Sequence, residues 1–253
     1  MEVHHHPHVH GKKKFTEYLL ESFMLFLAVT LGFLAENLRE HLSEQRKEKE
    51  YIASFIDDLK KDTAEISSTS KQLFKNIHEE DSLIYLLQHY TNTDSANKKC
   101  YRHYLRSAVN VAFAAFNQNT MNQLLNTGSV RLITKQSILD SIMAYNGLIK
   151  SVNLQADYYN DEFKKGFDYS TNIFDLSYIH GRLNDDYTVK PTMRYDTAHF
   201  KLVNADENVL RKYAAYLIMQ QNLSTGYLLE LRSARVYADR LIKLLKKEYR
   251  LKE

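Results

Sequence analysis

The residues of this chain that could do chemistry are densest at its N-terminus, where imidazole groups stand close together. The cluster consists of His4, His5, His6, His8 and His10. Neutral imidazole binds Zn²⁺, Ni²⁺ and Cu²⁺, and a short tail can wrap around such an ion. Without neighbouring groups that orient the rings, a site of this kind has poor selectivity. Two interpretations stay open, a divalent-metal sensor or buffer and a tail that binds no metal in function; a metal titration of the tail peptide distinguishes them.

A second group of titratable residues lies in the irregular segment 179–207 and consists of His180, Asp185, Asp186, Asp196 and His199. Carboxylates and imidazoles that lie together can form a metal site or an acid–base pair. The chain has no H-E-x-x-H, G-x-S-x-G, P-loop or G-x-G-x-x-G motif. We therefore predict no enzymatic activity and no cofactor, and we expect this segment to cap the domain or to meet a partner. An enzyme that uses this segment is the alternative.

Two isolated residues, Glu21 and Cys100, could also take part in chemistry. Glu21 lies just inside an apolar run, where an ionisable group in a membrane is a functional candidate. A ring of Glu21 side chains in an oligomer would line an ion path; the simpler interpretation is that the carboxylate reaches the membrane surface. Cys100 is the single cysteine, so it cannot form an internal disulfide. Its surroundings predict an unreactive helical residue, and the alternative is a functional thiol whose pKa is lowered by Lys99 and Arg102.

The apolar run FMLFLAVTLGFLAEN occupies residues 23–37. No charged residue occurs from Ser22 to Ala35, and the run extends back to Tyr18 with Glu21 as its one charge. A cleaved signal peptide, a buried core helix and an uncleaved membrane anchor are the three interpretations. No small-x-small cleavage site follows the run, and its apolar residues surround the whole helix. We therefore predict a transmembrane anchor over residues 15–37, with Phe23, Leu27, Ala28, Gly32 and Phe33 among its members.

Small residues at two positions of this span favour self-association. Ala28 and Gly32 are four residues apart, so they lie on one face of a helix. Such a pair lets two membrane helices approach closely. We expect a homo-oligomer or a membrane-protein partner.

A leucine and isoleucine seam continues beyond the span. From Leu38 to Leu87, positions spaced alternately four and three residues apart are mostly leucine or isoleucine. This seam includes Leu38, Leu42, Ile52, Ile56, Leu59, Ile66 and Leu73. No glycine or proline interrupts this stretch. The pattern predicts one helix from the span to residue 87, with the seam as an assembly surface.

The first 65 residues combine this pattern with particular motifs. The histidine cluster and lysines precede the span, and a segment of the form YI-S---DL--D follows it, made of Tyr51, Ile52, Ser54, Asp58, Leu59 and Asp62. The N-terminal part resembles a family of uncharacterised bacteroidete single-span membrane-anchored helical proteins with a His-rich N-terminus. The likeness is looser over LLNTGSVRLI, residues 124–133. The resemblance implies that the histidines are native and implies no activity.

The remainder of the chain predicts three further helices, at about 99–126, 134–174 and 204–251, with a polar turn at 91–97. Two short strands are expected at 187–190 and 199–203. The predicted fold is all-α: an N-terminal transmembrane helix that continues into a long-helix, up-down four-helix bundle or coiled coil. Its divisions are a His/Lys-rich tail (1–14), the anchor (15–37) and a helical bundle domain (38–253).

The net charge and the basic residues beside the span limit the partners and the compartment that we can predict. The net charge is +3, without a concentrated basic face, so we predict no nucleic-acid binding. Three lysines precede the span and four basic residues follow it within residue 49, so the positive-inside rule does not decide the orientation. We expect a single-pass protein of the bacterial inner membrane with a periplasmic bundle domain; a cytoplasmic domain is the alternative. The predicted role is a self-associating scaffold, sensor or accessory subunit, with a metal-binding membrane protein as the alternative.

Overall fold

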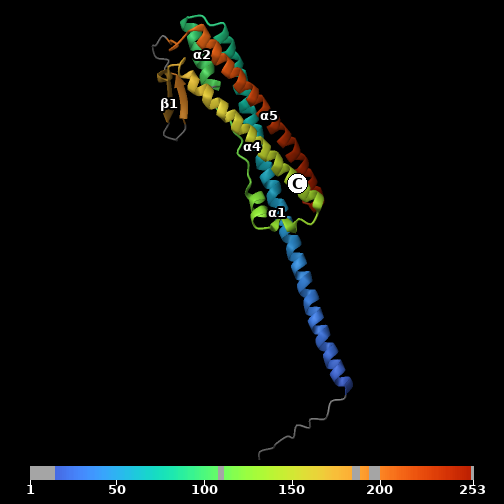
Figure 1. The fold of residues 1–253 in the computed structure, drawn as a ribbon. Helices are drawn as coiled ribbons and strands as arrows, with labels where there is room; N and C mark the ends of the chain where they lie inside the picture. Colours follow the sequence, from blue (N-terminus) through green and yellow to red (C-terminus); the bar gives the residue numbers. More distant parts are fainter. Residues whose placement is uncertain (1–14, 108–110, 184–188, 194–199, 252–253) are drawn as a thin grey trace, which may run out of the picture. The chain divides into compact units, whose positions relative to one another are not determined.

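The structure is a computed structural model that describes residues 15–107, 111–183, 189–193 and 200–251 (Figure 1). The chain divides into two compact units, Met1–Glu50 and Tyr51–Glu253. One helix, α1 (Phe15–Gln88), supplies all the described residues of the first unit and continues into the second. The expectation of one uninterrupted helix through residue 87 is confirmed.

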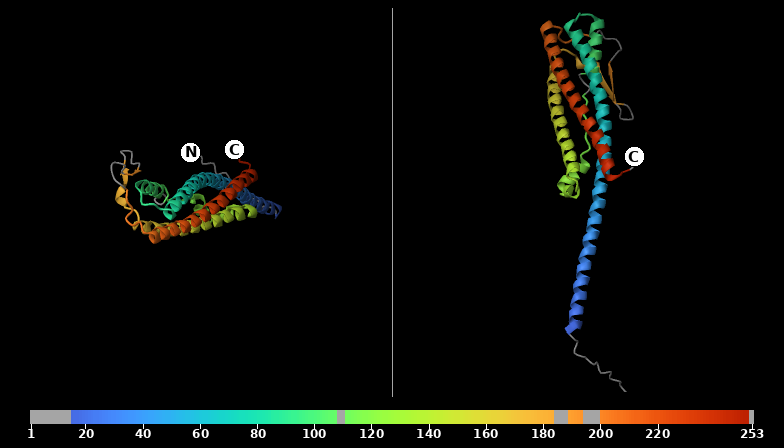
Figure 2. Two further views of the ribbon diagram at one scale, coloured as in Figure 1. Left: turned by 90° about the horizontal axis from the view of Figure 1, so that it is seen from above. Right: turned by 90° about the vertical axis from the view of Figure 1, so that its right-hand side faces the viewer.

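The second unit is built on long helices. The part of α1 from Tyr51 onward packs with α4 (Gln136–Ser170) and α5 (Glu207–Tyr249) (Figure 1 and Figure 2). The shorter elements are α2 (Asp94–Ser107), α3 (Asn119–Asn126), the 3₁₀ turns η1 (Ser129–Leu132) and η2 (Leu176–Tyr178), and an antiparallel hairpin of β1 (Ile179–Leu183) and β2 (Val189–Met193). The all-α fold class is therefore confirmed, with one two-stranded hairpin in the described part of the chain.

The ends of α5 and α3 follow from local chemistry. The Asp206 carboxylate accepts hydrogen bonds from the Asn208 and Val209 amides at the start of α5, which satisfies two otherwise unpaired donors. At the other end Arg250 adopts a left-handed conformation, and its amide bonds to the Lys246 carbonyl. Gly128, after α3, has φ +67°, a value that a residue without a side chain adopts at no steric cost.

The predicted helix over 99–126 is wrong in its middle. Helix α2 ends at Ser107, and residues 111–118 have no regular secondary structure before α3 begins; we call residues 111–118 the strap. Backbone groups of the strap bond to side chains of α1 and α5 instead of to a helical ladder. The Ala114 amide donates to the Tyr227 hydroxyl, the Asn117 amide to the Asp62 carboxylate, and the Thr69 hydroxyl to the Phe113 carbonyl. Distant side chains thus replace the hydrogen bonds that a helix would supply.

The predicted strand at 199–203 is also wrong, and the predicted strand at 187–190 coincides with β2 only at residues 189–190. Instead of pairing with a strand, residues 200–203 form hydrogen bonds with α2 and with Ile173. The Phe200 carbonyl accepts from the Asn97 amide group, the Lys201 carbonyl from the Tyr101 hydroxyl, and the Val203 amide donates to the Ile173 carbonyl. The true hairpin pairs Gly181 with Pro191.

Two hydrophobic clusters fill the second unit. One joins α1 residues from Ile52 to Leu73 with the strap, α4 and the C-terminal half of α5. The other joins the end of α1 with α2, Phe174 and Phe200 and the beginning of α5. Between the stretches of α1 that belong to these clusters lie two buried polar residues, Asn76 and Glu80.

Candidate functional site

The predicted membrane residues form the most apolar exposed surface of the first unit. An 18-residue window of α1 has a mean hydropathy of 1.9, and none of it is buried. Phe23 is 56% and Phe33 is 69% exposed. Helix α1 is thus one helix that is long and apolar enough to cross a membrane, a property that signal sequences share.

Polar groups in and beside this window are satisfied locally. The Thr30 hydroxyl donates to the Phe26 carbonyl one turn earlier at 2.8 Å. Arg39 donates two hydrogen bonds to the Glu36 carboxylate, from Nε at 3.0 Å and from Nη2 at 2.5 Å. Glu21 also lies on an exposed turn of α1. A side chain built on Gly32 would meet nothing within 4 Å, so the space beside Ala28 and Gly32 is open within one chain.

The predicted assembly seam is divided between two environments. Ile52, Ile56, Leu59, Ile66 and Leu73 are buried in the hydrophobic core of their own chain. Leu38 is 60% and Leu42 is 56% exposed. Of the predicted seam residues, these two leave apolar surface for another molecule.

The motif residues that follow the span hold the strap and its neighbours. Asp62 accepts from the Asn117 amide at 2.7 Å and from the Tyr145 hydroxyl at 2.8 Å. Asp58 accepts from both the amide and the hydroxyl of Thr120 at the beginning of α3. Burial raises the pKa of the Asp62 carboxyl, although both of its hydrogen bonds act to lower that pKa.

Tyr51 extends the same arrangement, because its hydroxyl lies 3.3 Å from the Ser129 hydroxyl. Ser129 belongs to the segment LLNTGSVRLI, where the family resemblance is looser. The segments 51–62 and 124–133 thus meet through a pair of hydroxyl groups, which is a structural role.

Glu80 is the most deeply buried carboxyl among the described residues of the second unit. It is 1% exposed, and its Oε1 accepts from the Gln220 amide of α5 at 2.7 Å. Its Oε2 is buried without a hydrogen-bond partner among the described residues. Burial raises its pKa to about 8, and the nearby Asp81 charge acts in the same direction. Burial, followed by the Glu80 charge, raises the pKa of Tyr159. In the folded protein the Glu80 carboxyl is therefore mostly protonated at neutral pH.

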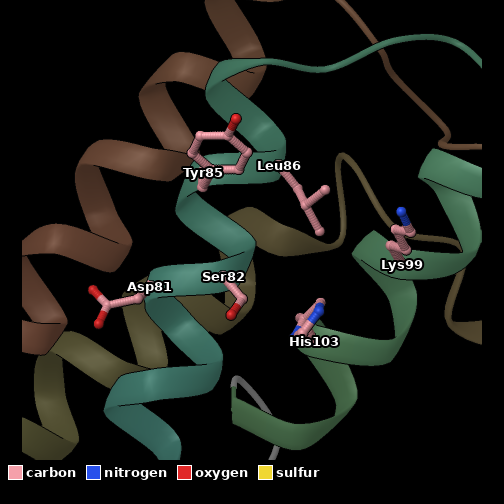
Figure 3. Close-up of a pocket in the computed structure, with 6 residues that line it drawn as sticks. All are labelled: Asp81, Ser82, Tyr85, Leu86, Lys99 and His103. Carbon is pink, nitrogen blue, oxygen red and sulfur yellow. The ribbon is translucent and has the colours of Figure 1, made fainter.

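A shallow pocket between α1 and α2 brings together residues of catalytic types (Figure 3). Ser82 and His103 project toward the space between the helices, whereas Asp81 points away from it. The His103 Nδ1 lies 2.6 Å from a Glu79 carboxylate oxygen, an orientation that suits a general base. The Ser82 hydroxyl, however, donates to the His78 carbonyl in its own helix. Ser82, His103 and Glu79 are thus the residue types of a catalytic triad, but the serine hydroxyl is bonded to its own helix and not to the histidine.

Cys100 fits the expected unreactive helical residue, and the alternative of a reactive thiol does not fit the structure. Cys100 is fully buried, and burial raises the pKa of its thiol to about 11. Lys99 and Arg102 are both exposed, so their charges lie in solvent instead of beside the sulfur.

The predicted metal ligands lie outside the described side chains. This holds for His4, His5, His6, His8 and His10 in the tail, and for Asp185, Asp186, Asp196 and His199 in the segment after α4. For His180 the structure gives the backbone, which pairs with Thr192 in the hairpin. Within the described residues no group of three His, Cys, Asp or Glu side chains could hold a metal ion.

Comparison of the chain with protein-family models, with curated proteins and with solved structures gives no match. The family resemblance of the first 65 residues therefore stays a prediction. What the structure supports is a mostly helical protein with one long apolar N-terminal helix.

Proposed function

We propose that this protein is a single-pass membrane-anchored scaffold or accessory subunit, held by the apolar part of α1. The observation that carries the proposal is the unburied 18-residue window of hydropathy 1.9. Soluble proteins seldom expose so large an apolar surface without a membrane or partner to cover it. The second unit supplies buried polar pairs and helix packing instead of a completed catalytic constellation, which favours a binding role.

The anchor can be tested with one substitution in the middle of the window. We expect Leu27→Arg to release most of the protein from carbonate-washed membranes. An arginine at the centre of a span costs about 3 kcal/mol relative to leucine, a factor of about 100 in insertion. The matched control is Leu154→Arg, at an exposed leucine of α4 in the second unit. Recovery of the unsubstituted chain in the soluble fraction would contradict the anchor.

Self-association through the span has its own test. We expect Gly32→Leu to lower the oligomeric mass of the full chain in detergent, measured by analytical ultracentrifugation, because a bulky side chain separates two closely packed helices. The space around Gly32 is open within one chain, so the change leaves the monomer intact. The control is Leu31→Ile, which keeps the small pair at Ala28 and Gly32. An unchanged mass for Gly32→Leu would exclude this interface.

The compartment follows from the same anchor. We place the second unit in the periplasm, with the cytoplasm as the alternative. A phosphatase fused after residue 253 will be active only if the C-terminus is exported. An inactive fusion of normal abundance would favour the cytoplasmic orientation.

A further inference from the structure

A groove of about 410 Å³ lies between α1 and α5 in the second unit. Its apolar lining includes Ile66 and Phe74 of α1 and Leu228 and Leu229 of α5. Ile66 is 1% exposed and forms a buried edge, whereas Phe74 is 57% and Leu229 is 58% exposed. Large side chains with this much exposure on facing helices form an apolar surface that a binding partner can cover.

Cations surround this apolar lining. Lys71 of α1 and Arg232 and Arg235 of α5 line the same groove, and all three are exposed. Elsewhere in this unit several cations are paired, for example Lys135 with Glu248 and Arg211 with Glu207. Among the described residues, no ion pair or hydrogen bond engages the three cations of the groove. They are therefore available to carboxylates of another molecule.

The dimensions of the groove suit a helix. Ile66 and Phe74 are eight residues apart on α1, about 12 Å at the rise of an α-helix, and Leu228 and Arg235 are about 10 Å apart on α5. Anchors at positions i, i+4 and i+7 of an amphipathic helix span about 10 Å. The side-chain pairs Gln220–Glu80 and Gln221–Asp81 fix the register of α1 against α5 close to the groove.

We propose that this groove binds an acidic amphipathic helix of a partner protein, with apolar anchors on Phe74 and Leu229 and carboxylates on Lys71, Arg232 and Arg235. The proposal rests on the accessory role and names the chemistry of the partner. Cations distributed along two turns of the groove match carboxylates distributed along a helix. A second copy of the same groove would oppose cation to cation, which disfavours a symmetric dimer at this face.

Photo-crosslinking tests the proposal in the full chain, expressed in its own host. Leu229→p-benzoylphenylalanine places the reactive group in the groove, and Leu154→p-benzoylphenylalanine is the control on α4, where the leucine is also exposed. We expect a crosslink at 229 and not at 154. The crosslinked peptide should carry apolar residues at helical spacing together with Asp or Glu.

Charge reversal supplies the second readout. We expect Arg232→Glu with Arg235→Glu to reduce the crosslink at least tenfold. Arg240→Glu with Lys243→Glu changes the same charge on exposed positions of α5 outside the groove and should leave the crosslink unchanged. Membrane recovery is measured in the same samples, so failure of the anchor is seen separately from failure of the groove. A crosslink to lipid, to a second copy or to a peptide without acidic residues would overturn the proposal, as would no crosslink in a folded protein.

Discussion

Replacing Glu80 with glutamine is expected to remove the loss of stability that ionisation of this buried carboxyl causes as the pH rises from about 4.5 to about 8. The folded-state pKa of Glu80 is about 8, compared with 4.5 for an ordinary glutamate. Below pH 4.5 the carboxyl is protonated in both states and carries no penalty. As the pH rises toward 8, the unfolded state gains the ionised form while the folded state keeps the proton. The free energy of unfolding therefore falls by about 1.4 kcal/mol for each pH unit in that window.

The Glu80→Gln variant has no proton to lose in this window. Its side-chain oxygen can still accept from Gln220, so this contact is preserved. We expect the variant to be more stable than the parent by about 3 kcal/mol at pH 7 and similar to it at pH 4.5. The measurement is denaturant unfolding of the full chain in detergent, followed by circular dichroism. Asp81→Asn, at the exposed neighbour, is the control, and parallel pH profiles for Glu80→Gln and the parent would contradict the assignment.

Removal of the Asp62 carboxylate is expected to have a comparable effect through hydrogen bonds. Asp62→Ala leaves the Asn117 amide and the Tyr145 hydroxyl without their acceptor. Each buried or part-buried donor that loses its partner costs about 1–3 kcal/mol, so the expected loss of stability is about 2–6 kcal/mol at pH 7. The strap should also become accessible to protease, because the Asn117 bond is one of the few that hold it. Limited proteolysis and denaturant unfolding report the two effects.

Nearby variants separate the two hydrogen bonds of Asp62. Tyr145→Phe removes the donor and leaves the strap bond, so we expect a smaller loss and an intact strap. Asp57→Ala removes an exposed carboxylate that pairs with Lys60 on the surface, and a change below about 0.5 kcal/mol is expected. Equal stability of the Asp62→Ala and Asp57→Ala variants would show that the strap contributes nothing.

The apolar helix and the long helices could be predicted because their signals are local. An uninterrupted apolar run and a leucine seam without breakers need no knowledge of distant residues. Glu80 also had a signal, since it lies seven residues after Leu73 in the register of the predicted seam. A charged residue at such a position indicates a buried polar contact, and Gln220 supplies it.

The strap and the groove could not be predicted from the sequence. Residues 111–118 have the apolar content of a helix face, and their actual partners, Asp62 and Tyr227, are more than 50 residues distant. The groove depends on how α1 and α5 are rotated about their axes, which places Phe74 and Leu229 outside the core. Cys100 shows the same limit, because its basic neighbours in sequence are not its neighbours in space.

The strap also sets an order of events during folding. The bonds of the strap depend on helices that must already be packed, because the Ala114 amide donates to Tyr227 of α5 and the Asn117 amide to Asp62 of α1. Contacts of high sequence separation repay their loop-closure entropy only after the elements they connect are in place. We expect the amide protons of Ala114 and Asn117 to gain protection from exchange later than those of α4 and α5. A chain caught on the ribosome before Tyr227 emerges would lack the hydroxyl that holds Ala114.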